Sequence, residues 1–476
     1  MAKIHLLGDE LRRHWQRFRA CFRTHTRDTS EHALEYMQGQ LTMEGDRTFA
    51  GIADQITGED GQALQHFMSQ SPWSACAVYA QVQAEIKAEP LLQHDSMLVL
   101  DESADEKAGV DSAGVSRQYN GRMGKVDQCV TAVLLGYVNW KSSPWPTWTL
   151  ADSELFLAEE WFSAPFAERR KKVGIPPERK FATKLDLGLQ MIRRTKANGL
   201  PFAGIACDDL YGRSQAFRAA LAQEHILYAA DVPANTRVYL ERPEIGLLPV
   251  PAKRKGRPPT RSQVVNGVPS YRVAQIGKQP TTYWQKLRIR HHERGVLEDD
   301  FAARLVWTWD ESQPEPRQEW LVMRIDRHDQ RHYTLSNAPH DVPVHFLAEL
   351  ACTRFFVERL IQDAKEEAGW GEFQAQKYLA WEHHTALTAC ALCFIMHVKL
   401  SWAQECERDP ELVQQLEVQV LPALSTANVR EMLRSVLPLP QLSPEEAQRQ
   451  VIKHLVHRSR STASRLRHRH RQAVPP

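Results

Sequence analysis

The sequence predicts an α/β protein of several domains, and three observations lead to this expectation. The chain has 476 residues, which is too long for one ordinary hydrophobic core and favours two to four domains. Between residues 94 and 232, short uninterrupted apolar runs alternate with segments of helical periodicity. Such runs are typical of strands buried on both faces, so their alternation with helices indicates a covered sheet.

Residues 1–93 are expected to form a helical N-terminal domain. Trp15 and Phe18 belong to an apolar series at helical spacing, and several arginines lie between its members. Ser71 and Pro72 form a typical helix start, with a capping side chain followed by a proline. This pattern fits a domain that docks on DNA, and it fits a packing domain without DNA contact equally well.

The segment 94–232 is expected to hold the first part of the α/β core. Its apolar runs predict strands, and its amphipathic stretches predict helices. The expected strands are 97–101, 130–137, 148–150, 202–207 and 226–230, and the expected helices are 177–198 and 212–224. The first and fourth of these strands lead directly into an aspartate.

The pattern changes again after the first part of the core. Residues 233–343 contain prolines, basic clusters and alternating strands, which indicates a β-rich insertion. Helical texture resumes in residues 344–403, which are expected to complete the core. Residues 404–476 are expected to form a helical C-terminal region with a basic tail.

Bulk composition favours a cytoplasmic protein without a membrane partner. Hydrophobic residues make up 42% and charged residues 25% of the chain, as in soluble globular proteins. The N-terminus is charged where a signal peptide needs an apolar stretch, and no uninterrupted apolar run reaches about 18 residues. The eight cysteines are scattered, which indicates a reducing compartment rather than a disulfide framework.

Local basic clusters say more about partners than the net charge of +2. The tail segment 452–471 carries seven Lys or Arg, four His and no acidic residue. A second basic cluster contains Lys253, Arg254, Lys255 and Arg257. Basic patches in a near-neutral chain suit a polyanion bound at particular places, while a solvated tail and a solvated loop are the open alternatives.

Two aspartates are candidate metal ligands, because each follows a predicted buried strand. Asp101 ends the first strand of the core, and Asp208 ends the strand 202–207. The carboxyl ends of parallel strands form the crevice where α/β proteins bind ligands. Two carboxylates in that crevice need a cation between them, and Mg²⁺ or Mn²⁺ is the natural choice. A single aspartate at such a position is more often a cap or turn residue.

A third candidate element is the helix expected around residues 354–365. Arg354, Glu358 and Lys365 fall within about 40° of one another on this helix, and apolar residues take the opposite side. Helical spacing alone also fits an exposed Arg–Glu pair, which stabilises a helix by only about 0.3–0.5 kcal/mol.

These residues resemble the Arg-x3-Glu-x6-Lys signature of insertion-sequence transposases in the DDE superfamily. The fuller signature has a tyrosine three residues before the arginine, where this chain has Ala351. LDESADEKAG, followed by SAGVSRQYNGRMGKV, resembles the first-aspartate segment of the insertion-sequence group numbered seven-oh-one. ACDDLYG resembles its second-aspartate segment, which assigns the ligand to Asp208 rather than Asp209. EYMQGQL and WLVMRID also resemble segments of that group, so the likeness covers roughly residues 30–400.

The resemblance implies a ribonuclease-H-like catalytic core, interrupted by the β-rich insertion, that holds two Mg²⁺ or Mn²⁺ ions per active site. Asp101 would bridge the two ions, Asp208 would hold one of them and Glu358 the other. Arg354 and Lys365 would contact DNA phosphates beside the ions. Water would nick the transposon end, and the freed 3′-hydroxyl would then attack a second phosphate.

The resemblance also implies the partners of the chain. Double-stranded DNA is expected as transposon terminal inverted repeats and as target, bound by a homodimer that joins two ends at the nucleoid. Trp284 is the candidate for stacking on a flipped base, with Trp307, Trp309 and Trp320 as alternatives and core packing as the plainer interpretation. A DNA-binding regulator that does not cut and a metal-dependent nuclease without strand transfer are the rival functions.

A zinc site is not expected from the sequence. Cys390 and Cys393 with His397 resemble half of such a site, but their neighbours form an apolar helix. No second Cys/His pair lies near them in sequence, and structural zinc takes four ligands. The hydrolase, P-loop and dinucleotide-binding motifs are also absent from the sequence.

Overall fold

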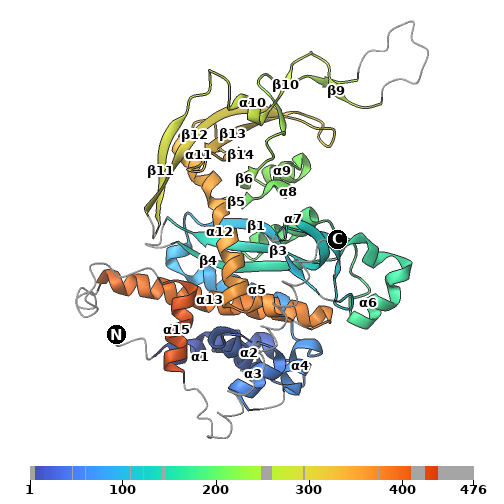
Figure 1. The fold of residues 1–476 in the computed structure, drawn as a ribbon, viewed down its shortest axis with the longest axis vertical. Coiled ribbons are helices and arrows are strands. Elements are labelled where there is room, and N and C mark those ends of the chain that lie inside the picture. The colour runs from blue at the N-terminus through green and yellow to red at the C-terminus, as the bar shows by residue number, and fades with distance from the viewer. Residues whose placement is uncertain are drawn as a thin grey trace, which may run out of the picture.

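The computed structural model describes residues 6–437 except 46, 59–60, 108, 122, 142–145, 248–259, 293–294, 374 and 409–423. Its layers follow one another along the long axis of the molecule. In Figure 1 the N-terminal helices lie at the bottom, the central strands lie in the middle, and the long strands of the residues near 300 lie at the top. The α/β class predicted from the sequence is confirmed by this arrangement.

The described part of the N-terminal segment is helical. Its α1 buries Leu11, Trp15 and Phe18, because these residues repeat at helical spacing. The last helix begins after Ser74, whose side chain caps it, and not at the Ser71–Pro72 step. The helices are α1 (Leu7–Phe18), α2 (Ser30–Thr42), α3 (Phe49–Ile56), α4 (Gln62–Ser69) and α5 (Ala75–Ala88), with turns η2 (Arg19–Phe22) and η3 (Pro90–Leu92).

The central strands form a mixed sheet with the order β4-β3-β1-β5-β6, and β2 pairs with the far part of β3. The strands are β1 (Met97–Glu106), β2 (Ser116–Asn120), β3 (Lys125–Asn139), β4 (Thr147–Phe156), β5 (Gly204–Cys207) and β6 (Leu227–Asp231). β1, β5 and β6 run parallel, while β3 runs antiparallel to β1. The expected strands are present, and β2 is an additional strand within the polar, glycine-containing stretch.

Helices cover this sheet, and one of them starts later than expected. The helix predicted from residue 177 begins at Lys184, because Thr183 and Asp186 form a capping box there. Phe181 therefore lies outside the helix and is exposed rather than part of its apolar face. The covering helices and turns are η4 (Glu159–Phe162), η5 (Ala164–Phe166), α6 (Ala167–Val173), α7 (Lys184–Ala197), α8 (Asp209–Gly212) and α9 (Gln215–Gln223).

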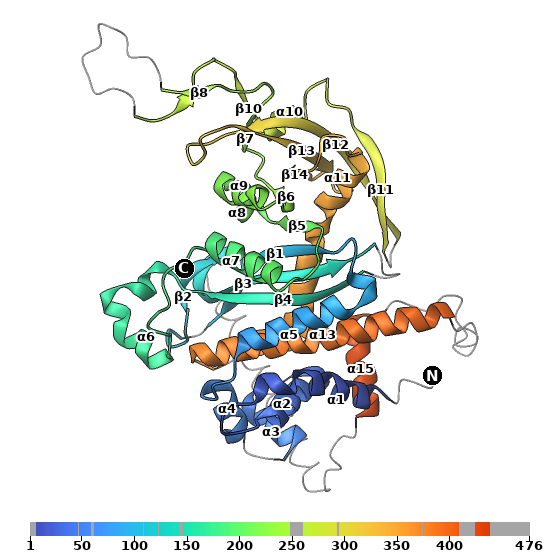
Figure 2. The same ribbon diagram turned by 180° about the vertical axis from the view of Figure 1, so that it is seen from behind.

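Most strands of the β-rich segment continue the same sheet, while β8 and β9 pair in a separate two-stranded sheet. β14 pairs antiparallel with β6, and β13, β12 and β11 follow in turn, so that the described sheet has twelve strands. Figure 2 shows these strands curving away above the core. The elements are β7 (Arg237–Tyr239), β8 (Ile245–Gly246), β9 (Gln263–Val264), β10 (Ser270–Arg272), α10 (Val273–Ile276), β11 (Gln285–His292), β12 (Gly295–Thr308), β13 (Arg317–Ile325) and β14 (Arg331–Ser336).

The remaining helices return from the strands to the core. They are α11 (Val344–Ala351), η6 (Cys352–Arg354), α12 (Phe355–Gln362), the π-helical turn η7 (Asp363–Glu367), η8 (Trp370–Glu372), α13 (Tyr378–Arg408) and α15 (Thr426–Val436). α13 lies beside α5, and these two helices together form a layer between α1–α4 and the sheet (Figure 1). The span Tyr378–Gln404 is long and apolar enough to cross a membrane, but 83% of its most apolar window is buried inside the protein. Such burial is typical of a core helix.

Candidate metal centre

Strand register brings Asp101 and Asp208 together. Residues Met97–Leu100 of β1 pair in parallel with Gly204–Cys207 of β5, and each aspartate is the next residue along its chain. Asp101 does not end its strand as expected, because β1 continues to Glu106 by pairing with β3. It lies where the parallel ladder with β5 ends, so both carboxylates face the same opening in the sheet.

Glu102 adds a third carboxylate that the sequence analysis did not select. Ligand oxygens of Asp101, Glu102 and Asp208 all lie within 4.8 Å of one another. Lys184 Nζ contacts one Glu102 oxygen at 3.1 Å, while the other oxygen, Oε2, is buried without a hydrogen-bond partner. Consecutive strand residues point to opposite faces, so a flexible glutamate beside Asp101 is not expected to reach the same site.

The electrostatics of this cluster favour a bound cation. Burial and the neighbouring Asp208 carboxylate raise the pKa of Asp101 to about 8. Burial, with Glu102 and Asp209 nearby, raises the pKa of Asp208 to about 7. Oxygen ligands of this kind suit Mg²⁺ or Mn²⁺, and the unpartnered Glu102 oxygen is a further free ligand atom. The residues present therefore fit a divalent metal centre.

Arg354 connects Glu358 to the aspartates. Its guanidinium lies 2.7 Å from Glu358 Oε1, 2.9 Å from Asp231 Oδ2 and 3.6 Å from Asp101 Oδ2. Glu358 itself is 54% exposed and lies outside the described cluster of three carboxylates. The structure thus brings Asp101 and Asp208 together directly and links Glu358 to Asp101 through one arginine.

Asp231 is a second acidic residue that the sequence analysis did not select. It ends β6, the third parallel strand, and accepts a hydrogen bond of 2.6 Å from Thr334 Oγ1 of β14. Burial raises its pKa, and Arg354 opposes that effect. The sequence could have predicted Asp231 as a candidate, because it follows an apolar run just as Asp101 and Asp208 do.

Lys365 lies at a different point along β1. Its ammonium contacts Asp105 Oδ1 at 3.1 Å and donates to the Ala104 carbonyl at 2.8 Å, with the side chain only 11% exposed. Arg354 and Lys365 therefore both face β1, at Asp101 and Asp105. A phosphate contact of Lys365 stays a prediction.

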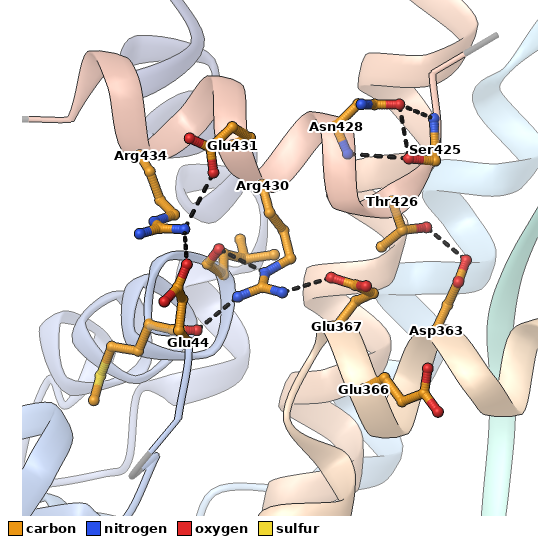
Figure 3. Close-up of polar contacts among 12 residues, drawn as sticks. Glu44, Asp363, Glu366, Glu367, Ser425, Thr426, Asn428, Arg430, Glu431 and Arg434 are labelled. Atoms are coloured by element: carbon orange, nitrogen blue, oxygen red, sulfur yellow. Dashed lines mark hydrogen bonds and ion pairs between the residues drawn. The ribbon is translucent and has the colours of Figure 1, made fainter. Parts of the chain in front are cut away.

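Helix α15 fixes the turn that follows α12. Figure 3 shows Thr426 donating to the buried carboxylate of Asp363, with an oxygen–oxygen distance of 2.5 Å. Arg430 contacts Glu367 at 2.5 Å and donates to the carbonyls of Leu41 and Met43. The π-helical turn η7 is thus held from two sides. π-turns inside helices frequently occur at functional sites.

Replacing Arg430 with methionine is expected to lower the free energy of unfolding by about 2–3 kcal/mol, because Glu367 and two carbonyls lose a buried partner. Arg434→Met is the matched control, since its partners Glu44 and Glu431 are 75% and 70% exposed. The control is expected to change the same quantity by less than about 0.5 kcal/mol. Urea unfolding of the two variants measures the difference, and equal losses would contradict the assigned role of Arg430.

The remaining DNA-contact candidates are dispersed. Trp284 precedes β11, packs against the core of the β-rich segment and lies 5.8 Å from the Arg331 guanidinium. Its neighbour Tyr283 is 75% exposed and is the more accessible ring of the two. The indole N–H groups of Trp309 and Trp320 donate to backbone carbonyls, as packed tryptophans do. The cluster Lys253, Arg254, Lys255 and Arg257 and the basic tail lie outside the described residues.

Comparison with known proteins identifies relatives of this chain. A family model described as a DDE superfamily endonuclease matches residues 17–296, more than half of the chain. The matched stretch includes Asp101 and Asp208 and ends before Glu358. A curated relative from Microchaete diplosiphon, named "Probable transposase for insertion sequence element IS701", is 24% identical over 190 residues. That alignment covers 40% of this chain and 45% of the relative.

Proposed function

Because the chain belongs to the DDE superfamily of endonucleases, we propose that it is a DNA transposase. It binds the terminal inverted repeats of its element, cleaves the transposon ends and transfers their 3′-hydroxyl strands into target DNA. The register of β1 and β5 carries this proposal, because it sets the carboxylates of Asp101 and Asp208 side by side. Strands hold such a constellation more rigidly than loops do.

The proposed cofactor is a pair of Mg²⁺ or Mn²⁺ ions. Asp101, Asp208 and Glu358 would hold the ions, and Glu102 would offer an additional oxygen. When bound, the ions neutralise charge on the entering and leaving oxygens of the phosphodiester. Arg354 has to release the Glu358 carboxylate before Glu358 can act as a ligand.

Two phosphoryl transfers follow from this assignment. In the first, water attacks the phosphorus at the transposon end, the bond to the 3′ oxygen breaks and a 3′-hydroxyl remains. In the second, that hydroxyl attacks either the opposite strand or target DNA, and another hydroxyl leaves. Arg354, released from Glu358, is positioned to bind the phosphate beside the carboxylates. Lys365 is a second proposed phosphate contact, for which its pairing with Asp105 has to open.

The proposed organisation assigns a role to each part of the chain. Residues 94–232 and 344–403 form a ribonuclease-H-like core, and the order β4-β3-β1-β5-β6 with its parallel β1, β5 and β6 supports this assignment. The insertion 233–343 is proposed to contact DNA through its basic cluster and through Trp284. The N-terminal segment 1–93, whose described part is helical, is proposed to dock on DNA, and the basic tail of the C-terminal region 404–476 is proposed as a contact with DNA or with a partner protein.

The proposed assembly is a homodimer in the DNA complex, because both ends of an element must be cut and moved together. We also propose that the protein lies in the cytoplasm at the nucleoid, because the proposed substrate is DNA. Sedimentation of the protein with terminal-repeat DNA tests the stoichiometry directly, and a complex with one chain per pair of ends would exclude the dimer.

The experiment that tests the function is incubation of the full chain with the inverted repeats of its element and Mg²⁺ or Mn²⁺. We expect cleavage at the ends followed by joining of the 3′ strands to a target plasmid. Glu358→Gln is expected to bind the same DNA without cutting it, whereas Glu366→Gln, a nearby glutamate whose carboxylate contacts Gln362, is expected to cut normally.

The products separate the rival functions. Cleavage without joined product identifies a metal-dependent nuclease that lacks strand transfer. Binding without cleavage in either metal identifies a regulator that does not cut, and it would overturn the proposed chemistry.

A further inference from the structure

A second cluster of metal-ligand side chains lies where α1, α5 and α13 meet, on the opposite side of α13 from the sheet. His14 comes from α1, Glu85 from α5 and His397 from α13. One donor atom from each of the three lies within 4.8 Å of the other two. The folding of the N-terminal helices against α13 thus brings together residues from opposite ends of the chain.

Two free thiols border this cluster. Cys393 Sγ lies 3.9 Å from His397 Nδ1, and Cys390 Sγ lies 3.6 Å from His14 Nε2. Both cysteines are buried. Cys393 and His397 are four residues apart on α13 and therefore share one helix face. The half-site visible in the sequence is completed here by residues that are distant in the chain.

We propose that this cluster is a second metal site, which binds one Zn²⁺ through His14, Glu85 and His397, with the Cys393 thiolate as fourth ligand. Nitrogen, oxygen and sulfur are the atoms that zinc prefers, and four is the usual number in structural sites. Zinc bond lengths of about 2.0–2.3 Å place tetrahedral ligand atoms about 3.4 Å apart. The donors of His14, Glu85 and His397, which lie within 4.8 Å of one another, therefore have to close by up to about 1.4 Å. Cys393 Sγ, at 3.9 Å from His397 Nδ1, has to move toward the same centre.

The protonation states suit metal binding. Burial lowers the pKa of His14 well below its usual value, and the neighbouring His397 and Arg17 lower it further. Burial also lowers the pKa of His397. Both imidazoles are therefore neutral at pH 7, which is the form that binds metal. The Cys393 thiol differs from the imidazoles, because burial raises its pKa well above the usual value and keeps it protonated without metal. Zinc has to displace this proton to solvent when it binds.

Arg17 is the competitor of the metal. Its guanidinium lies 2.6 Å from Glu85 Oε2 and 3.1 Å from His14 Nδ1, so a cation already occupies the position beside these ligands. The Arg17 side chain is 45% exposed and has room to turn toward solvent when zinc binds. If the cluster were only a hydrogen-bonded network, removal of Arg17 would weaken it. As a zinc site, it gains affinity when the competing charge is removed.

The zinc would join the N-terminal helices to α13, which packs on β4 of the core. This role is independent of the proposed transposase activity, since none of these ligands belongs to the carboxylate cluster. A protein without nuclease activity could therefore still hold the zinc, and an active one could lack it.

The test is the zinc content of the full chain purified from zinc-supplemented medium, measured by plasma emission. We expect about one Zn²⁺ per chain in the wild type and in Asp208→Asn. Losses of most of the zinc are expected in His397→Ala and Cys393→Ser. Cys76→Ser, which alters an exposed cysteine, is the control that should keep the full content.

Cobalt titration of the wild type and of Arg17→Ala tests whether the cluster binds metal, even if the ligand variants fold poorly. Thiolate-coordinated Co²⁺ gives a charge-transfer band, and we expect this band in both proteins. In Arg17→Ala the band is expected to reach half of its maximum at a several-fold lower Co²⁺ concentration than in the wild type. Background zinc in the wild type, together with no cobalt band in either protein, would overturn the proposal.

Discussion

Replacing Asp208 with asparagine is expected to reduce metal-dependent DNA cleavage by on the order of 10³-fold, which corresponds to about 4 kcal/mol. The carboxylate is lost as a metal ligand, while the fold is retained. Asp208 also accepts a hydrogen bond from the Leu210 N–H at the start of α8, and asparagine caps helices about as well as aspartate. Cleavage of labelled terminal-repeat DNA, with DNA binding measured in parallel, reports the effect.

Asp209→Asn is the matched control, because it removes one negative charge from the adjacent position. Asp209 pairs with Arg213 at 2.7 Å, and its side chain is 46% exposed. We expect its cleavage rate to stay within about twofold of wild type, since it offers no ligand to the described cluster. Equal losses in the two variants would show that general charge, and not ligation by Asp208, supports the reaction.

The elements that carry the site were predictable where local pattern decides the structure. The apolar runs before Asp101 and Asp208 predicted two buried strands, and both strands are present. Their parallel pairing is a tertiary property, so the sequence indicated the aspartates without showing that Leu100 and Cys207 are partners. The continuation of β1 beyond Asp101 also depends on β3, a strand distant in sequence.

The missed site residues have different physical origins. Asp231 follows an apolar run and was available to the same argument as Asp208. Glu102 could not be predicted in this way. Side chains alternate between the two faces of a strand, so a site that contains Asp101 is not expected to contain its neighbour Glu102. The pairing of Lys365 with Asp105 depends on how η7, the turn that follows α12, lies along β1, which no local pattern shows.

The β-rich segment and the cysteine half-site also depend on tertiary contacts that local sequence patterns do not predict. Alternating residues predicted strands in the insertion, but only the pairing of Leu335 with Ala230 reveals that they extend the core sheet. Likewise, Cys393 and His397 share a helix face by spacing alone, whereas His14 reaches them only through helix packing. In both cases the structure differs from the prediction because long-range contacts, which local sequence patterns do not show, determine the arrangement.

The contribution of Asp101 and Asp208 to the stability of the metal-free protein is expected to fall as the pH rises from about 5 to about 8. It opposes the trend of buried histidines such as His383 and His384, whose pKa values burial lowers to about 4. Asp101 and Asp208 have pKa values of about 8 and about 7, well above those of unfolded aspartates. In this window the native state binds protons that the unfolded state has released, so raising the pH favours unfolding. The loss is on the order of 6 kcal/mol at about 1.4 kcal/mol per pH unit for each retained proton, because each carboxylate becomes charged beside another in a buried place.

Divalent metal is expected to remove this decline. Mg²⁺ binds the ionised carboxylates of the native state and not the unfolded chain, so its stabilising effect grows with pH over the same window. Asp208→Asn should remove most of this falling contribution, since Asp101 then loses its charged neighbour, and should also abolish most of the metal effect. Urea unfolding at a series of pH values, with EDTA or with Mg²⁺, measures both. Metal-free profiles of wild type and Asp208→Asn that run parallel between about pH 5 and about pH 8 would mean that the two carboxylates are not held together as described, and cleavage by such a protein would require a different set of ligands.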